Sequence, residues 1–131
     1  MNLDKFSIGD QKQLRFKVES KDTATFETGQ VHPFYATFAL GRDAEWTCRQ
    51  FALEIKEMDE EGIGTYLTIH HQSPALLGSE VQITAKIKAI QNHEIICHWE
   101  AYCGERLIAI GEQGQKILKK EKIERLMQKL G

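Results

Sequence analysis

The sequence lacks an excess of positive charge and lacks any long apolar segment. Its 131 residues include 17 Lys and Arg against 19 Asp and Glu, which gives a formal net charge of −2. Binding to nucleic acid or to anionic lipid relies on a basic excess, so we expect neither partner. No apolar run approaches the roughly 18–20 residues that span a bilayer, and the first residues lack the apolar core of a signal peptide. We therefore expect a cytoplasmic protein with no membrane segment.

Cysteine and proline are also scarce. The three cysteines are an odd number without Cys-x-x-Cys spacing, which predicts reduced, partly buried thiols rather than a disulfide framework or a zinc site. The two prolines mark no linker, and no repeat or shift in composition divides the chain. No P-loop or Gly-x-Gly-x-x-Gly motif is present to hold a nucleotide phosphate. We expect residues 1–131 to form a single domain that needs no metal and no cofactor.

Alternating apolar and polar residues predict strands, most clearly in the second half of the chain. Val81–Ala89 and Ile95–Tyr102 each alternate with a period of two, and a third run extends from Leu107 to about Leu118. Gly62–Ser73 is rich in β-branched and aromatic residues and indicates a fourth strand. Lys12–Val18 is a weaker fifth candidate. Tight polar turns between the later runs favour an antiparallel sheet of five strands.

Two segments have helical spacing instead. From about Tyr35 to Glu57 the apolar residues occupy more than one narrow stripe, which predicts a largely buried helix about 30 Å long. Lys119–Leu130 predicts a short amphipathic helix that packs on the domain or on a partner. This order of elements predicts an α+β protein of the hotdog fold, with a long central helix wrapped by a five-stranded antiparallel sheet. Such a sheet has open edges, so we expect a homodimer or a higher homo-oligomer.

Two adjacent histidines lie in the predicted fourth strand. His70 and His71 must point to opposite faces of the sheet, because side chains alternate along a strand. His71 shares its face with Leu67 and Ile69, which predicts that it looks towards the helix. An imidazole there needs a hydrogen-bond partner, so a purely structural histidine is the alternative to a catalytic one.

The long helix carries a second set of candidates. Thr37, Gly41 and Glu45 are spaced by four residues and lie along one stripe, and Gly41 leaves a hollow between the hydroxyl and the carboxylate. A carboxylate with an imidazole activates water, and a threonine hydroxyl binds, orients or attacks, which suits acyl transfer. Eight helical residues span about 12 Å, so substrate or water must bridge the two ends. Alternatively, Thr37 caps the helix and Glu45 is a surface acid beside Arg42 or Arg49.

Four short motifs occur in a fixed order along the chain. They are Phe34-Tyr35-Ala36-Thr37, Asp43-Ala44-Glu45-Trp46, Gly62-Ile63-Gly64-Thr65 leading to His71, and Gly111-Glu112-Gln113-Gly114. In these motifs the sequence resembles the fluoroacetyl-CoA thioesterase-like family of hotdog-fold thioesterases, over about two thirds of its length. Both intervals of that family's Thr, Glu and His set are matched, from Thr37 to Glu45 and from Glu45 to His71.

The resemblance implies hydrolysis of an acyl-CoA thioester in a cleft at the interface of a homodimer. It implies that Glu45 works with Thr37 on the thioester carbonyl, as nucleophile or as base. It further implies that His71 activates water or protonates the departing thiolate, and that the backbone amide of Gly64 contacts the substrate or the oxyanion.

The resemblance also implies substrate contacts at Tyr35 and Gly41. The segment Gly29–Pro33 does not align with the region that selects substrate in that family, so selectivity for a fluorinated acyl group is not part of the expectation. A short or medium acyl group is expected instead.

Two other functions are compatible with the same fold. One is a non-catalytic hotdog module that binds an acyl-CoA without turnover. The other is a hydratase or dehydratase, which needs an acid/base pair that often contains Asp and His in a recognisable loop. The sequence has no such loop, and Asp43 is the only nearby acid for that role.

Overall fold

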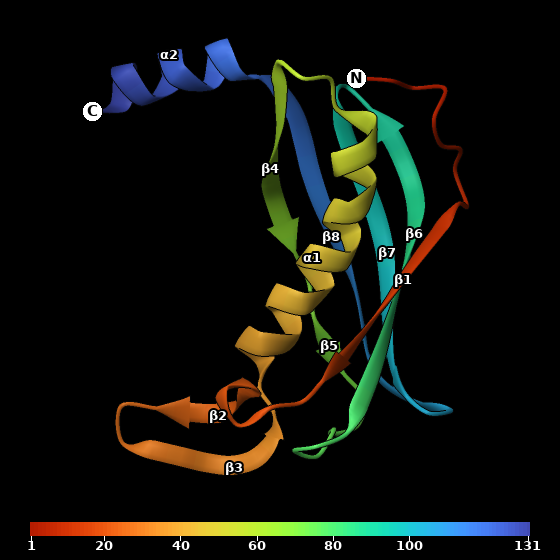
Figure 1. Ribbon diagram of the computed structural model, residues 1–131, viewed down its shortest axis with the longest axis vertical. Coiled ribbons are helices and arrows are strands. Elements are labelled where there is room, and N and C mark those ends of the chain that lie inside the picture. Colours follow the sequence, from red (N-terminus) through yellow and green to blue (C-terminus); the bar gives the residue numbers. More distant parts are fainter.

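A curled antiparallel sheet and one long helix along its inner face make up most of the computed structural model, which describes residues 1–131 (Figure 1). The helix is α1 (Thr37–Ile55). The strands of the sheet follow the order β1-β6-β7-β8-β4, and β5 also pairs with β8. Their bounds are β1 Gln11–Lys17, β4 Glu60–Leu67, β5 His70–His71, β6 Glu80–Gln91, β7 Glu94–Cys103 and β8 Arg106–Lys119.

The core lies between α1 and the concave face of the sheet. On α1 the buried residues include Leu40, Ala44, Cys48, Phe51 and Ile55, which recur every three or four positions and so form one face of the helix. The strands contribute alternate residues, which are all fully or almost fully buried: Val81, Ile83, Ala85 and Ile87 from β6, Ile95, Cys97 and Trp99 from β7, and Ile117 from β8. Removal of these apolar side chains from water is the main force that fixes the helix on the sheet.

Three smaller elements flank this core. The 3-10 helix η1 (Ser20–Asp22) and the hairpin of β2 (Thr23–Phe26) and β3 (Gly29–Tyr35) lie at the N-terminal end of α1 (Figure 1). At the other end, α2 (Lys120–Leu130) leaves the sheet beyond β4 and has no buried residue (Figure 1).

The predicted α+β hotdog architecture is confirmed, as are the three free thiols. One expected strand differs: the run Gly62–Ser73 is divided into β4 and β5 at Thr68–Ile69. Here the backbone N–H of Thr68 donates to Glu112 O (2.9 Å), and the Thr68 hydroxyl accepts from the Glu112 N–H (2.9 Å), so a side chain replaces part of the ladder. Because both pieces pair with β8, the sheet is still five strands wide.

Two further differences concern the N-terminal half. The β2–β3 hairpin was not predicted, because its strands are short and lack regular alternation. In addition, α1 is less buried than expected: the side chains of Phe38 and Trp46 remain 50% and 48% exposed. The sheet covers only one face of the helix. On the other, Phe38 meets the Phe26 ring of the hairpin with ring centroids 6.3 Å apart. Neither α1 nor α2 has the length and apolar character that a membrane-spanning helix requires.

Candidate active site

Thr37 and His71 are in direct contact. The Thr37 Oγ1 and the His71 Nε2 lie 2.9 Å apart, a hydrogen-bond distance. Thr37 is the first residue of α1 and follows the N-cap residue Ala36, and no side chain caps the helix. The interpretation of Thr37 as a cap is therefore wrong, and its hydroxyl forms a hydrogen bond with the His71 imidazole instead. His71 looks towards the helix, as the alternation along its strand predicts.

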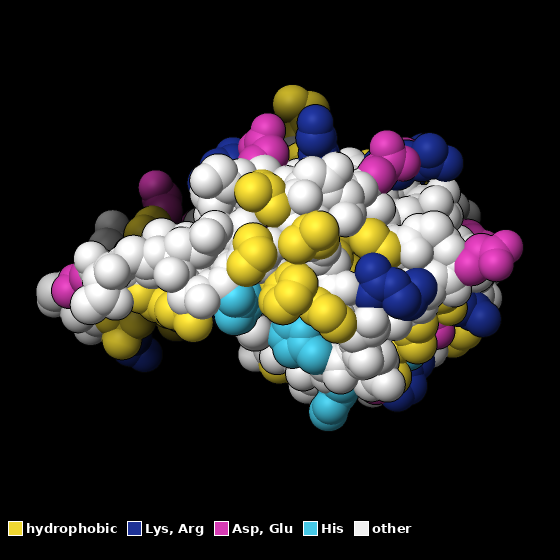
Figure 2. Space-filling view, turned by 90° about the horizontal axis from the view of Figure 1, so that it is seen from below, with side chains coloured by type: hydrophobic (Ala, Val, Ile, Leu, Met, Phe, Trp, Pro, Cys, Tyr) yellow, Lys and Arg dark blue, Asp and Glu magenta, His cyan; other side chains and the backbone are white.

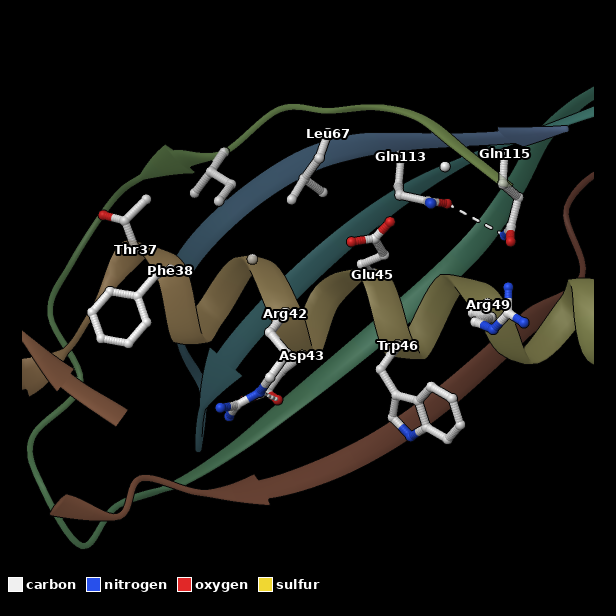
Figure 3. Close-up of a pocket in the computed structure, with 13 residues that line it drawn as sticks. Thr37, Phe38, Arg42, Asp43, Glu45, Trp46, Arg49, Leu67, Gln113 and Gln115 are labelled. Carbon is white, nitrogen blue, oxygen red and sulfur yellow. Dashed lines mark hydrogen bonds and ion pairs between the residues drawn. The ribbon is translucent and has the colours of Figure 1, made fainter. Parts of the chain in front are cut away.

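Glu45 lies two turns further along α1, on the same side, and its carboxylate points towards β4 (Figure 3). It forms no ion pair and no side-chain hydrogen bond within the chain. The alternative of a surface acid beside Arg42 or Arg49 agrees with its exposure, and both arginines line the same hollow, but their guanidinium groups bind other carboxylates. Glu45 is thus an exposed and unpaired carboxylate at the edge of the sheet.

Gly64 on β4 faces this carboxylate at close range. A Cβ atom built on Gly64 would lie 2.6 Å from the Glu45 Oε1, closer than real side-chain contacts allow. Any side chain at this position would therefore displace the carboxylate. The absence of a side chain brings the β4 backbone directly against Glu45.

Gly41 lies between these two pairs. A Cβ here would meet the Ile69 Cδ1 at 3.1 Å and the Leu67 Cδ2 at 3.2 Å. Leu67 and Ile69 thus border the hollow that we expected at Gly41, which Gly41 itself lines. The structure places Thr37 with His71 and Glu45 with Gly64, and the two pairs are about 12 Å apart along the helix axis.

Two surface hollows follow this side of α1. The larger, of about 900 Å³, lies between α1 and the strands β4 and β8, and Thr37, Gly41, Glu45 and Gly64 line it (Figure 3). The smaller, of about 560 Å³, lies under the β2–β3 hairpin and is lined by His71 and by apolar side chains that include Phe26, Val31 and Phe34. Thr37 and Phe38 line both hollows, so the two adjoin at these residues, and we refer to them together as the cleft. His71 lines the smaller hollow, whereas Glu45 and Gly64 line the larger.

The apolar part of this cleft lies at the end of the molecule that carries the β2–β3 hairpin. Figure 2 looks at that end, where apolar side chains gather on the surface beside histidine side chains. Phe26 and Val31 are more than 60% exposed there. Large apolar side chains left in water around a hollow are typical of a ligand or interaction surface.

Two glutamines of β8 belong to the larger hollow, and sequence reasoning missed them. Gln113 and Gln115 are each only 1% exposed and line the cleft beside Glu45 (Figure 3). They share the inward row of β8 with Ile117. The sequence did carry a signal: two glutamines stand at positions of the strand whose side chains face the core. A polar group there needs a hydrogen-bond partner or a functional role.

A cluster of four polar side chains fixes the start of α1; we call Asp22, Tyr35, Arg42 and Asp43 the N-terminal cluster. All but the half-exposed Arg42 are buried. The Tyr35 hydroxyl donates to Asp43, and Arg42 donates to Asp43 and to Asp22, each at 2.9 Å. Burial, followed by the hydrogen bond to Asp43, raises the pKa of Tyr35 far above its usual value. Hydrogen bonds to Asp43 and Asp22 likewise raise the pKa of Arg42.

This cluster joins the hairpin, η1 and the helix close to Thr37, where the helix begins. The backbone adds to it, because the Ala36 N–H donates to Asp22 O at 2.8 Å. The Tyr35 side chain is 6% exposed and is held in the cluster. Its contact with a substrate stays a prediction, as do the roles of Gly41, Gly64, Thr37, Glu45 and His71.

The sequence matches one protein family. A profile of the fluoroacetyl-CoA-specific thioesterase family, FlK, matches residues 18–121. No curated protein matches the sequence.

Solved structures give the same picture of the fold. A hypothetical protein of Thermus thermophilus, described as a thioesterase superfamily member, is 33% identical, with 95% of this chain and 92% of that chain covered and a TM-score of 0.90. The fluoroacetyl-CoA thioesterase FlK is 19% identical, with coverages of 95% and 96% and a TM-score of 0.85. A hot-dog-like protein of Thermanaerovibrio acidaminovorans is 19% identical, with coverages of 96% and 94% and a TM-score of 0.86.

The N-terminal cluster gives a prediction about stability. Tyr35→Phe removes one donor from the buried Asp43 carboxylate, and we expect the free energy of unfolding to fall by about 1–3 kcal/mol. Urea denaturation followed by circular dichroism measures this change. Tyr102→Phe is the matched control, because the Tyr102 hydroxyl bonds only Glu100, on a partly exposed face of the sheet. Equal losses in the two variants would contradict the importance of the cluster.

Proposed function

The chain belongs to the fluoroacetyl-CoA-specific thioesterase family and is a thioester hydrolase, and from this premise we propose that it hydrolyses a short or medium acyl-CoA through Thr37, Glu45 and His71. The observation that supports the proposal is that Thr37 is bonded to His71 at one hollow, while Glu45 lies unpaired against Gly64 in the adjoining one.

In the proposed reaction the Glu45 carboxylate attacks the thioester carbonyl carbon or removes a proton from the water that attacks it. When water attacks, its oxygen bonds to the carbonyl carbon and the carbon–sulfur bond breaks. When Glu45 itself attacks, the carbon–sulfur bond breaks to give a mixed anhydride, which water then cleaves to the carboxylic acid and free Glu45. The departing CoA thiolate takes up a proton that bridging water relays from His71. Water supplies the oxygen of the carboxylic acid product and the protons that balance the reaction. Thr37 orients His71 and contacts the thioester, and the Gly64 amide faces the oxygen that becomes negative.

The lining of the cleft supports an acyl substrate. The hollow under the hairpin is walled by apolar side chains, among them Phe26, Val31 and Phe34, and opens next to Thr37 and His71. An acyl chain gains by leaving water for such a surface, whereas a charged group does not. We propose CoA as the acyl carrier, because variants of FlK have been solved in complex with acetyl-CoA and with fluoroacetate and CoA.

We further propose that two copies of the chain associate through β4. The other edge of the sheet, β1, carries Lys12, Arg15 and Lys17, and charged side chains of this kind discourage pairing at an edge. Along β4, Gly62–Leu67 has no charged residue and its outer edge is free. The half-exposed Trp46 and the apolar residues of α2 supply further surface for the association.

The experiment that tests the catalytic proposal measures release of free thiol from a panel of acyl-CoAs of increasing chain length. We expect turnover by the parent and a fall of at least a hundredfold in both Glu45→Ala and His71→Ala. His70→Ala is the matched control, since this neighbour lies on the opposite face of the strand, and it should keep the parental rate. Activity that survives both substitutions would mean that the site is wrong. A folded protein with no turnover on any chain length would favour the binding module.

Gly64 offers a second test. Gly64→Ala introduces a methyl group where the Glu45 carboxylate lies, so we expect kcat to fall at least tenfold with little change in the melting temperature. Steady-state kinetics and a thermal melt measure the two quantities. Gly62→Ala is the control on the same face of β4, because its methyl group would meet the flexible end of Arg49 at 3.2 Å. Equal losses in kcat for both variants would argue against a special role of Gly64.

The assembly is tested by sedimentation velocity. We expect a species of twice the 15.0 kDa of one chain, because pairing at β4 extends the sheet across two copies. Replacing Ile63, a 39% exposed residue of β4, by Lys should shift the population towards the single chain. A single-chain mass for the parent at micromolar concentration would refute this part of the proposal.

A further inference from the structure

The row of β8 that faces the helix contains two side-chain amides where apolar residues would pack well. Burial of an amide costs free energy unless its polar atoms find partners. The amide nitrogen of Gln115 has two acceptors: its Nε2 donates to Cys48 O at 3.1 Å and to the Gln113 Oε1 at 3.4 Å. Two polar atoms of this pair form no hydrogen bond within the chain: the Gln115 Oε1, which is an acceptor, and the Gln113 Nε2, which is the one free donor.

The direction of this free donor follows from its partner. Since the Gln113 Oε1 accepts from Gln115 (dashed line in Figure 3), the Nε2 is the atom of the amide that stays free on the side of Gly64. It lies 4.0 Å from the place where a Cβ on Gly64 would be, and the Glu45 Oε1 lies 2.6 Å from the same place. The amide donor and the carboxylate therefore border one small space next to the β4 backbone.

The other side-chain donors near this space are engaged or point elsewhere. Arg42 is bonded within the N-terminal cluster, and Arg49 donates to Glu61 and to Gly62 O. The indole of Trp46 projects from the opposite side of α1 (Figure 3). Gln113 is thus the side chain at this end of the cleft with a donor to spare.

We propose that the Gln113 Nε2 donates a hydrogen bond to the acyl carbonyl oxygen of the thioester and stabilises the oxyanion that forms there. The inference rests on the proposed function and adds a substrate-contacting residue to it. A carboxylate at Glu45 cannot donate to that oxygen, so its donors come from other groups, and Gln113 adds a side-chain donor to the backbone amide proposed at Gly64. Gln115 is a positioning residue, because its bond to the Gln113 Oε1 keeps the amide nitrogen turned towards the cleft.

An uncharged donor suits this position. A lysine or arginine beside Glu45 would form an ion pair with the carboxylate and reduce its reactivity towards the carbonyl carbon. An amide donates to developing negative charge without neutralising the neighbouring carboxylate. Because the amide is held in place before the substrate arrives, little reorganisation is needed as the charge forms.

The kinetic test compares Gln113→Met with the parent on the best acyl-CoA. We expect kcat to fall about a hundredfold, as for removal of one oxyanion donor, with KM changed less than threefold. Ile117→Met alters the same inward row of β8 without removing an amide and should keep kcat within threefold. Gln115→Met should lower kcat by a smaller factor, because Gln113 loses its anchor but keeps its donor. A Gln113→Met enzyme within threefold of the parental kcat would overturn the inference.

A binding test works without turnover and separates this inference from the proposed function. It compares a ketone analogue, in which CH₂ replaces the thioester sulfur, with the alkyl thioether of CoA that lacks the carbonyl. We expect the parent to bind the ketone about fivefold more tightly by calorimetry, and Gln113→Met to lose that preference. Gln113→Glu has a side chain of equal size that only accepts hydrogen bonds when ionised, so it should also lose the preference for the ketone. This variant replaces Gln113→Met in the test if the methionine variant fails to fold.

The outcomes are distinct. A parent that prefers the ketone but hydrolyses no acyl-CoA, with the preference lost in Gln113→Met, would refute the proposed hydrolysis and retain the Gln113 contact. A preference that survives both substitutions at Gln113 would refute the contact, whatever the rate of turnover. A parent that binds both analogues equally, or neither, would also refute it.

Discussion

The close approach of α1 to the strands β4 and β5 is the constraint on which the site depends. It requires a helix face without bulk, and Gly41 provides this opposite Leu67 and Ile69. It also requires a strand without a side chain opposite Glu45, which Gly64 provides. A side chain at Gly64 would push the Glu45 carboxylate out of its place, and one at Gly41 would crowd the ends of Leu67 and Ile69.

A second constraint acts at the start of the helix. Two buried carboxylates, Asp22 and Asp43, share the guanidinium of Arg42, and the hydroxyl of Tyr35 adds a donor. Removing any member leaves a charge or a polar group without its partner in a buried place, which is costly. The first turn of α1 is therefore held by polar contacts, whereas the rest of the helix is held by apolar packing. This division lets Thr37 reach the solvent-exposed cleft while the helix that carries it stays fixed.

Periodicity predicted much of the fold and part of the site. The long strands β6, β7 and β8 and both helices follow from alternation and helical spacing, because each has one face in the core. The stripe of Thr37, Gly41 and Glu45 and the inward direction of His71 follow from the same geometry. The break at Thr68 and the β2–β3 hairpin do not, because a side chain that replaces a ladder bond, and short strands paired away from the core, leave no periodic signal. Gln113 was missed for another reason: its meaning depends on Gln115 and Gly64, which only the folded sheet brings near it.

The polar residues of the cleft differ in how they are held, and this difference fits a hydrolase. Glu45 is unpaired, so its carboxylate is available to a substrate or to water. Thr37 and His71 hold each other at 2.9 Å, which fixes the ring nitrogen that a leaving group would meet. Gln113 is fixed at one end by Gln115 and free at the other. A fold selected for stability alone would place apolar side chains at both glutamine positions, because an entirely apolar row avoids the free-energy cost of burying amides. At Gln113 the free amide hydrogen is available to the carbonyl oxygen that we propose it binds.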